Sequence, residues 1–218
     1  AMSLTLHHCH EARSMRVLWL LHELEIDFEL KVYPFTGLHS DEYLRVHPLA
    51  RVPALEHNGQ VLYESGAIIQ YLCELYSPDQ LGRLPGHAER PAWLQWLHFA
   101  ETIAVHGASL VQQHLVIYQD EMRSATVQKL ERRRMEKGLA MLNQHLSGSE
   151  YLLTRFSAVD VAVGYSIYLA RFFTDIKQFP ELQRYYLSLA SRPAFRTSLP
   201  KEGDSHIIFQ QDFYTGPA

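Results

Sequence analysis

The sequence predicts an α/β domain followed by an all-α domain. Residues 3–77 alternate strand-like and helix-like patterns, whereas the segments after about residue 89 have helical spacing throughout. Between them, residues 78–88 contain two prolines and two glycines, which is typical of a linker. The predicted domains are therefore residues 3–77 and residues 89–218. A chain of 218 residues is long enough to bury two small cores.

The first domain is predicted to open with a strand, a helix and a second strand. Leu4 and Leu6 alternate with polar neighbours, as in a short strand, and residues 15–24 carry apolar side chains at helical spacing. Residues 28–33 alternate again and give the second strand. An irregular stretch is expected after it, through residues 37–48.

A hairpin and a helix are predicted to complete this domain. Residues 54–57 and 61–63 flank Asn58-Gly59, a pair that suits a type I′ turn because both central positions need positive φ. Residues 65–76 then have an apolar face typical of a buried helix. The predicted order is βαβ-ββα.

The second domain is predicted to be a bundle of helices. The first begins at about Pro91, where proline fits the first helical turn, and a second covers residues 124–145. Ser157 and Asp160 have the spacing of a helix cap, and the segment after them is so apolar that it must be buried. Two shorter helices are predicted to begin at Pro180 and Pro193.

Composition excludes several classes of protein. A formal net charge of −4 gives no chain-wide attraction for nucleic acid, so no such partner is expected. The basic run Arg132–Arg134 is flanked by glutamates, as on the solvated face of a helix. No apolar run approaches the roughly 20 residues of a membrane-spanning helix, so no membrane association is expected. Two cysteines are too few for a disulfide framework, and the sequence predicts a cytoplasmic protein.

One segment of the first domain suits an extended peptide ligand. A cis bond before Pro53 would turn the backbone at Val52 outward, where it can pair with such a ligand. Ser65 begins a helix, whose N–H groups and dipole bind a carboxylate, and Glu64 can hold an ammonium group. Taken alone, Ser65 could be only a helix cap and Pro53 only a turn. Their joint occurrence favours a ligand such as glutathione, which has an amino-acid end and an extended peptide body.

The run RVPALEHNGQVLYESGAIIQYL, which begins at Arg51, resembles the glutathione-site motif of cytosolic glutathione transferases. ARSMRVLWLLHELEIDFEL is similar to the first helix and second strand of bacterial and fungal members, and SAVDVAVGYSI to the capping box of their sixth helix. The resemblance extends over nearly the whole chain. It implies the glutathione transferase fold, a thioredoxin-like domain followed by a helical bundle.

The resemblance also implies a function. Residues Glu64 and Ser65 would hold the γ-glutamyl end of glutathione, and Val52, before a cis Pro53, would pair with the cysteinyl backbone. Two further residues would lie near the glycine carboxylate: His39 and Arg51. Glutathione would be the co-substrate of a detoxifying transferase that attacks a small hydrophobic electrophile or a peroxide. A homodimer without a metal ion is expected.

The sequence departs from the family at the position that activates the thiol. An alignment through the letters RVL places Glu11 where serine-type members have serine, and a carboxylate there would raise the pKa of the thiol. Ser14 is the first candidate to donate to a thiolate instead, ahead of His10 and Arg13. Cys9 could form a mixed disulfide with glutathione, as a reductase does, or be an inert strand residue. A non-catalytic binding protein of the same fold is the remaining alternative.

His7-His8-Cys9-His10 has the side chains of a zinc site but not the expected geometry. In an extended strand, His7 and Cys9 face one side of the sheet while His8 and His10 face the other. The four side chains then cannot converge on one ion, and no metal site is predicted.

Overall fold

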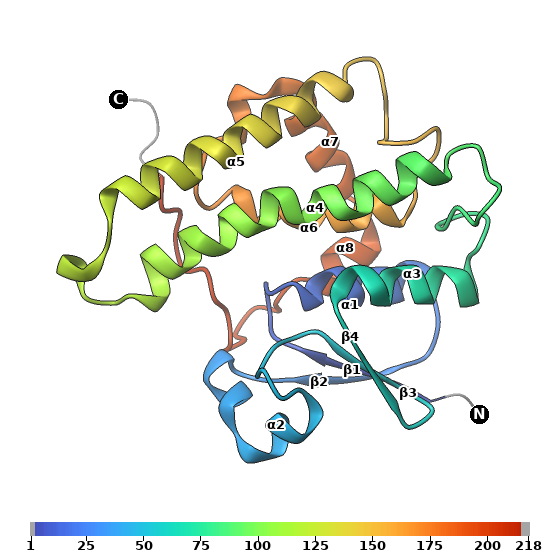
Figure 1. The fold of residues 1–218 in the computed structure, drawn as a ribbon, viewed down its shortest axis with the longest axis horizontal. Helices are drawn as coiled ribbons and strands as arrows, with labels where there is room; N and C mark the ends of the chain where they lie inside the picture. The colour runs from blue at the N-terminus through green and yellow to red at the C-terminus, as the bar shows by residue number, and fades with distance from the viewer. Residues whose placement is uncertain (1–2, 215–218) are drawn as a thin grey trace. The chain divides into compact units, whose positions relative to one another are not determined.

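The computed structural model of the chain describes residues 3–214 (Figure 1). The chain divides into two compact units. Of the described residues, the first unit contains 3–87 together with Ala190–Gln210, and the second contains Ala88–Leu189 and residues 211–214.

This division differs from the sequence-based domains in one respect. The first boundary falls within the predicted linker, residues 78–88. Residues 190–210, however, belong to the first unit, although the sequence analysis assigned them to the helical half. They do so because α8 (Pro193–Ser198) packs on α1 (Ser14–Leu24).

A four-stranded sheet forms the centre of the first unit, with strand order β2-β1-β3-β4. The first strand pairs in parallel with β2 and antiparallel with β3, and β3 pairs antiparallel with β4. Helix α1 connects the two parallel strands, and α3 follows the last strand. The predicted βαβ-ββα order of a thioredoxin-like domain is confirmed. The strands of this domain are β1 (Leu4–His8), β2 (Glu29–Val32), β3 (Ala54–His57) and β4 (Gln60–Tyr63), and the helix after β4 is α3 (Ser65–Tyr76).

Two local predictions in this unit have different outcomes. Asn58 and Gly59 have φ values of 52° and 81°, as the predicted type I′ turn requires. The prediction of an irregular stretch through residues 37–48 was wrong, since it contains a 3₁₀ turn, Phe35–His39, and helix α2, Asp41–Val46. Helix α2 begins there because the side chain of Ser40 accepts a hydrogen bond from the Tyr43 N–H group, a standard N-cap.

The C-terminal return of the chain is anchored on α1. The rings of Trp19 and Phe195 meet edge to face, with centroids 5.0 Å apart. Beside them, the Arg192 guanidinium binds both carboxylate oxygens of Glu23, at 2.7 and 3.0 Å. An aromatic pair and a bidentate ion pair therefore hold α8 in the first unit.

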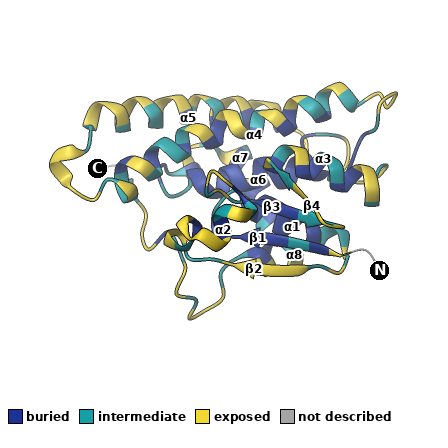
Figure 2. Cartoon of the chain, turned by 60° about the horizontal axis from the view of Figure 1, so that its bottom comes forward, coloured by how far each residue is buried: buried dark blue, intermediate teal, exposed yellow. Residues whose placement is uncertain are grey.

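The second unit is helical throughout its regular structure. Its main helices are α4 (Arg90–Val111), α5 (Ala125–His145), α6 (Ala158–Ala170) and α7 (Pro180–Ala190). Single turns of other helix types lie between them: Gln112–Val116, Asp120–Met122 and Ile176–Gln178. Helix α4 packs against both α5 and α6, and every residue of α6 is buried, as predicted (Figure 2).

A capping box fixes the start of α6. The Asp160 carboxylate accepts the Ser157 N–H group at 2.9 Å and the Leu152 N–H group at 3.2 Å. The hydroxyl of Tyr185 donates to the same carboxylate at 2.5 Å. Asp160 is fully buried, so these donors satisfy a charge that would otherwise destabilise the unit. The predicted cap is confirmed, and the tyrosine from α7 extends it.

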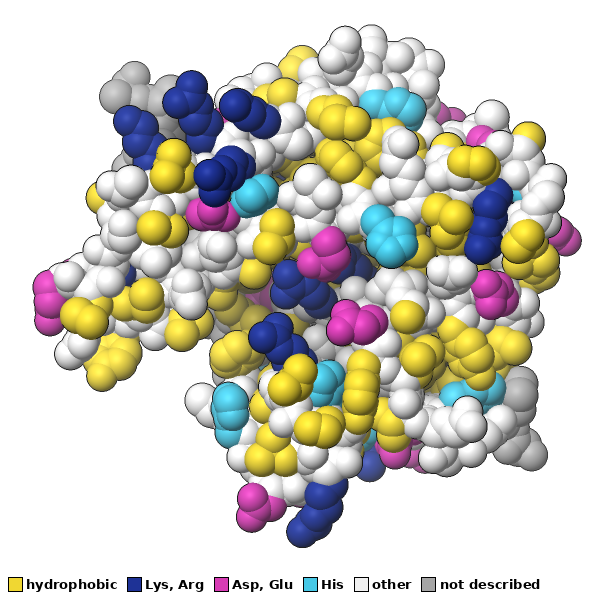
Figure 3. Space-filling view, in the orientation of Figure 1, with side chains coloured by type: hydrophobic (Ala, Val, Ile, Leu, Met, Phe, Trp, Pro, Cys, Tyr) yellow, Lys and Arg dark blue, Asp and Glu magenta, His cyan; other side chains and the backbone are white. Residues whose placement is uncertain are grey.

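The outer face of α5 is polar. The side chains of Arg132 and Arg134 are 36% and 60% exposed, and basic side chains gather over α5 at the upper left of Figure 3. Each lies near a glutamate of the same helix, as predicted for a solvated face. Within residues 3–214, no helix is long and apolar enough to cross a membrane.

Candidate functional site

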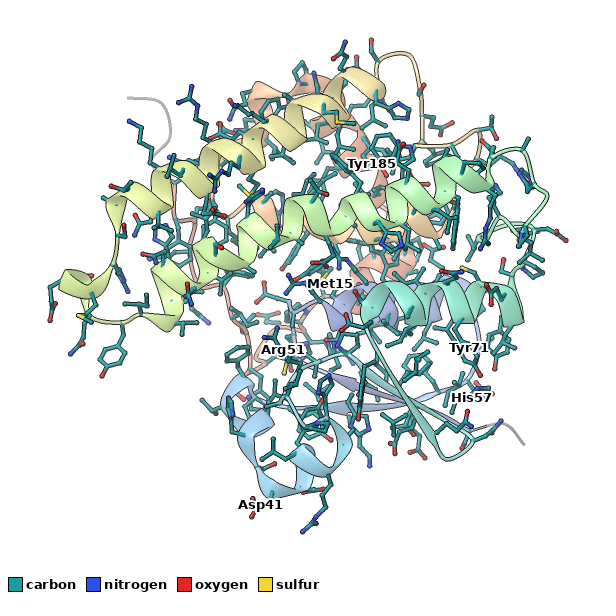
Figure 4. The ribbon with its side chains drawn as sticks, in the orientation of Figure 1. Met15, Asp41, Arg51, His57, Tyr71 and Tyr185 are labelled. Carbon is teal, nitrogen blue, oxygen red and sulfur yellow. The ribbon has the colours of Figure 1, made fainter. Side chains whose placement is uncertain are left out.

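The segment that leads into β3 has the backbone expected for the site. The Val52-Pro53 peptide bond is cis, Pro53 is buried and Val52 is half-buried. Arg51 is exposed, and its carbonyl oxygen accepts a hydrogen bond from the Tyr43 hydroxyl. In Figure 4, Arg51 lies on the side of the first unit where α2 and the start of α3 are found. His39, the last residue of the 3₁₀ turn, is also exposed.

Glu64 and Ser65 form the junction between β4 and α3. Glu64 is exposed and has a φ of 74° with a ψ of 114°, a backbone conformation that costs a non-glycine residue on the order of 1–3 kcal/mol. Such strain is commonly kept at ligand sites. Ser65 is the first residue of α3 and is only 7% exposed. The Ser65 hydroxyl therefore lies at the positive end of the α3 dipole, beside the first N–H groups of the helix, where a ligand carboxylate can bind.

A buried arginine, which the sequence analysis did not identify, supports this junction. Arg16 lies on α1, is 1% exposed, and donates from Nη1 to Ser65 Oγ at 3.2 Å. Because Ser65 Oγ accepts from the guanidinium, its own O–H group is left to donate to a ligand. The sequence contains one sign of this contact: Arg16 stands inside an apolar helical segment, and a buried charge requires polar partners.

Ser14, the first candidate for thiol activation, is fully buried at the start of α1. Its Oγ lies 2.7 Å from Nδ1 of His8, accepts the Cys9 N–H group at 3.2 Å and is 3.2 Å from the Cys9 carbonyl oxygen. Burial, with His10 nearby, lowers the pKa of His8 to about 3, so that ring is neutral. The Ser14 hydroxyl therefore holds the turn between β1 and α1.

Cys9 is enclosed on the opposite face of the sheet. Its side chain is 1% exposed and packs with Leu38 and Tyr43. Burial raises the pKa of the Cys9 thiol to about 12. The group is thus protonated at neutral pH, whereas disulfide exchange requires a thiolate. The structure gives the reductase alternative no activated nucleophile at this position.

The histidines around Cys9 are separated as the strand pattern predicts. His7 lies between the Tyr33 hydroxyl and the Glu56 carboxylate, with both contacts at 2.8 Å. His8 points to Ser14 on the other side of the sheet. Across residues 3–214, no three His, Cys, Asp or Glu side chains are grouped as metal ligands would be.

Glu11 has a role that the sequence analysis did not foresee. It lies between β1 and α1 with a φ of 67°, and its Oε1 accepts the N–H groups of Ile208 and Phe209 at 2.9 and 3.1 Å. Next to it, His10 Nε2 is 3.4 Å from the Asp204 carboxylate. The side chain expected beside the thiol therefore holds the C-terminal segment of the first unit. No local pattern relates residues almost 200 positions apart.

Comparison with known proteins agrees with the resemblance in the sequence. Residues 2–74 match the family model described as "Glutathione S-transferase, N-terminal domain". Glutathione S-transferase 3 of Schizosaccharomyces pombe is 27% identical over 222 residues, which cover 96% of this chain and 92% of the relative. The relative therefore aligns with both halves of the chain.

Solved structures share the fold. A glutathione transferase from Phanerochaete chrysosporium, in complex with oxidized glutathione, superposes with a TM-score of 0.80 at 25% identity, over 91% of this chain and 95% of that one. A glutathione transferase from Pseudomonas putida, with one glutathione disulfide bound per subunit, has a TM-score of 0.77 at 25% identity and covers 92% of each chain. The fold of this chain is that of glutathione transferases.

Proposed function

We propose that the chain is a glutathione transferase, which binds glutathione at the start of α3 and directs its thiol at a small apolar electrophile or a peroxide. The observation that carries the proposal is the Glu64-Ser65 junction, where a strained backbone, a helix N-terminus and the Arg16 guanidinium meet. These features suit an α-amino acid group, which has one carboxylate and one ammonium. The crystallised relatives that hold oxidized glutathione support this choice of ligand.

The remaining binding residues follow from the extended shape of the ligand. With the γ-glutamyl end at Glu64 and Ser65, the cysteinyl backbone would pair with Val52. The glycine carboxylate would then reach the exposed basic side chains of His39 and Arg51. An ionised carboxylate is stabilised by hydrogen bonds from N–H groups, and most strongly by those of the Arg51 guanidinium.

Thiol activation is assigned to the start of α1. Within the described chain, no side chain caps this helix, so the positive end of its dipole can stabilise a thiolate bound there. Ser14 would act indirectly, by fixing the turn that precedes the helix. In this proposal Glu11 binds the C-terminal segment of the first unit. The two backbone N–H groups that donate hydrogen bonds to its carboxylate reduce the effect of its charge on the glutathione thiol.

A second candidate function is glutathione binding without catalysis. It is favoured by one observation, which is that the polar groups of Ser14 and Glu11 and the thiol of Cys9 all face protein partners. A non-catalytic protein would keep the Glu64-Ser65 junction and would not turn over any electrophile.

An activity panel with calorimetry tests the proposal and separates the two candidates. Glutathione titrated into the protein should give a saturable heat, and an aryl halide, an organic peroxide or both should be consumed only when glutathione is present. Mixed-disulfide reduction should be absent, because Cys9 is buried and protonated. Binding without turnover of any substrate would favour the non-catalytic candidate, and the absence of binding would refute both.

A homodimer is also proposed, because the resemblance to glutathione transferases implies a pair of chains related by a two-fold axis. Light scattering at micromolar concentration should give about twice the chain mass of 25.2 kDa. A mass that remains near that of one chain over a hundredfold range of concentration would contradict this prediction. A cytoplasmic location is proposed as well, because the chain resembles cytosolic glutathione transferases.

A further inference from the structure

We propose that Tyr43 and Tyr63 are positioning residues for glutathione: their hydroxyls hold the two ends of the backbone segment Val46–Arg51, which leads into the ligand-pairing residue Val52. This inference rests on the proposed function of the site. Neither tyrosine belongs to the set of residues expected to contact the ligand.

The two hydroxyls come from different elements and reach opposite ends of the same segment. Tyr43, on α2, is fully buried and donates to the carbonyl oxygen of Arg51. Tyr63, the last residue of β4, donates to the carbonyl oxygen of Val46 at 2.8 Å. Each bond satisfies a backbone acceptor that no helix or strand ladder satisfies.

Between these two points the segment folds back on itself. The His47 carbonyl oxygen accepts the Ala50 N–H group at 3.0 Å, and His47 Nδ1 accepts the Leu49 N–H group at 3.2 Å. Ala50 has a φ of 54°, a left-handed conformation that is uncommon for a residue other than glycine. The imidazole of His47 lies against the Tyr63 ring, with centroids 4.2 Å apart. Tyr63 therefore contacts the turn through its ring as well as through its hydroxyl.

These contacts determine where the ligand-pairing backbone lies. Arg51 is bonded covalently to Val52, so fixing the Arg51 carbonyl sets the direction in which the next peptide group points. A preformed segment loses little conformational entropy when the ligand binds, and this lowers the dissociation constant. If the two hydroxyls are removed, the free segment has more conformational entropy, and the loss of this entropy on binding raises the dissociation constant.

Three phenylalanine variants test the inference: Tyr43→Phe, Tyr63→Phe and a matched control, Tyr71→Phe. Tyr71 also uses its hydroxyl, which lies 2.6 Å from His57 Nδ1, but the pair is at the far end of the hairpin from Arg51 (Figure 4). Removing one hydrogen bond to the segment should raise the dissociation constant of glutathione about three- to tenfold. The control should bind like the unaltered protein.

The pattern of effects distinguishes positioning from general destabilisation. The KM for glutathione should rise in both variants while kcat at saturating glutathione stays within twofold, and amide hydrogen exchange should become faster in residues 46–52 but not in α3. Equal binding by all four proteins would overturn the inference, as would weaker binding without faster exchange in the segment. If Tyr43→Phe does not fold, Tyr63→Phe decides the question. Failure of the unaltered protein to bind glutathione would instead refute the proposed function.

Discussion

Replacing Ser65 by alanine is expected to weaken glutathione binding by about ten- to a hundredfold. The Ser65 hydroxyl is the side-chain donor at the start of α3. Arg16 orients it, because Nη1 of the guanidinium donates a hydrogen bond to Ser65 Oγ at 3.2 Å. Loss of a hydrogen bond to a charged group costs about 1.5–3 kcal/mol, which corresponds to this range of dissociation constants. Isothermal titration calorimetry measures it directly.

The same helix supplies a control for this variant. Ser77, just beyond the other end of α3, accepts the Leu81 N–H group at 3.1 Å and has no part in the proposed site. Ser77→Ala should therefore leave the affinity for glutathione unchanged while lowering stability slightly. An unchanged dissociation constant for Ser65→Ala would show that glutathione does not bind at this junction.

Replacing Asp160 by alanine is expected to destabilise the second unit by about 3–5 kcal/mol. The substitution leaves the N–H groups of Leu152 and Ser157 and the hydroxyl of Tyr185 without this acceptor in a fully buried place, and each such donor costs about 1–3 kcal/mol. Urea unfolding followed by helical circular dichroism measures the loss.

Asp160→Asn separates hydrogen bonding from packing at this position. Asparagine can keep one carbonyl oxygen for Leu152 and Tyr185, which share Oδ1, but loses the second oxygen that accepts from Ser157. Its urea midpoint should fall between those of the unaltered protein and the alanine variant. Equal midpoints for the aspartate and alanine proteins would show that the capping box does not stabilise the unit.

Features encoded by neighbouring residues could be predicted from the sequence. The Asn58-Gly59 turn, the Ser157–Asp160 cap and the helix from Ser65 depend on side chains within a few positions of one another. The motif around Pro53 and Ser65 was visible for the same reason. Helix α2 was missed because it has only six residues, too few to show a periodic apolar face.

Features that depend on distant partners could not be predicted. The contact of Arg16 with Ser65 joins residues 49 positions apart, and Glu11 meets the Ile208 and Phe209 backbone across almost 200. Sequence position therefore suggested that Glu11 opposes the thiolate, when its nearest donors are backbone groups of the C-terminal segment. Spacing rules contain no information about such pairs.

The return of residues 190–210 to the first unit affects the order in which the protein can be completed on the ribosome. The strands of that unit are synthesised first, but Trp19 and Glu23 on α1 must wait for Phe195 and Arg192. About 100 residues lie between His87 and these partners, which at about 5–20 residues per second is roughly 5–20 s of synthesis. All of α4, α5 and α6 emerge during that interval. The unit that begins first therefore cannot be completed until these helices have been made, and the side of α1 that α8 covers stays without its partner until then.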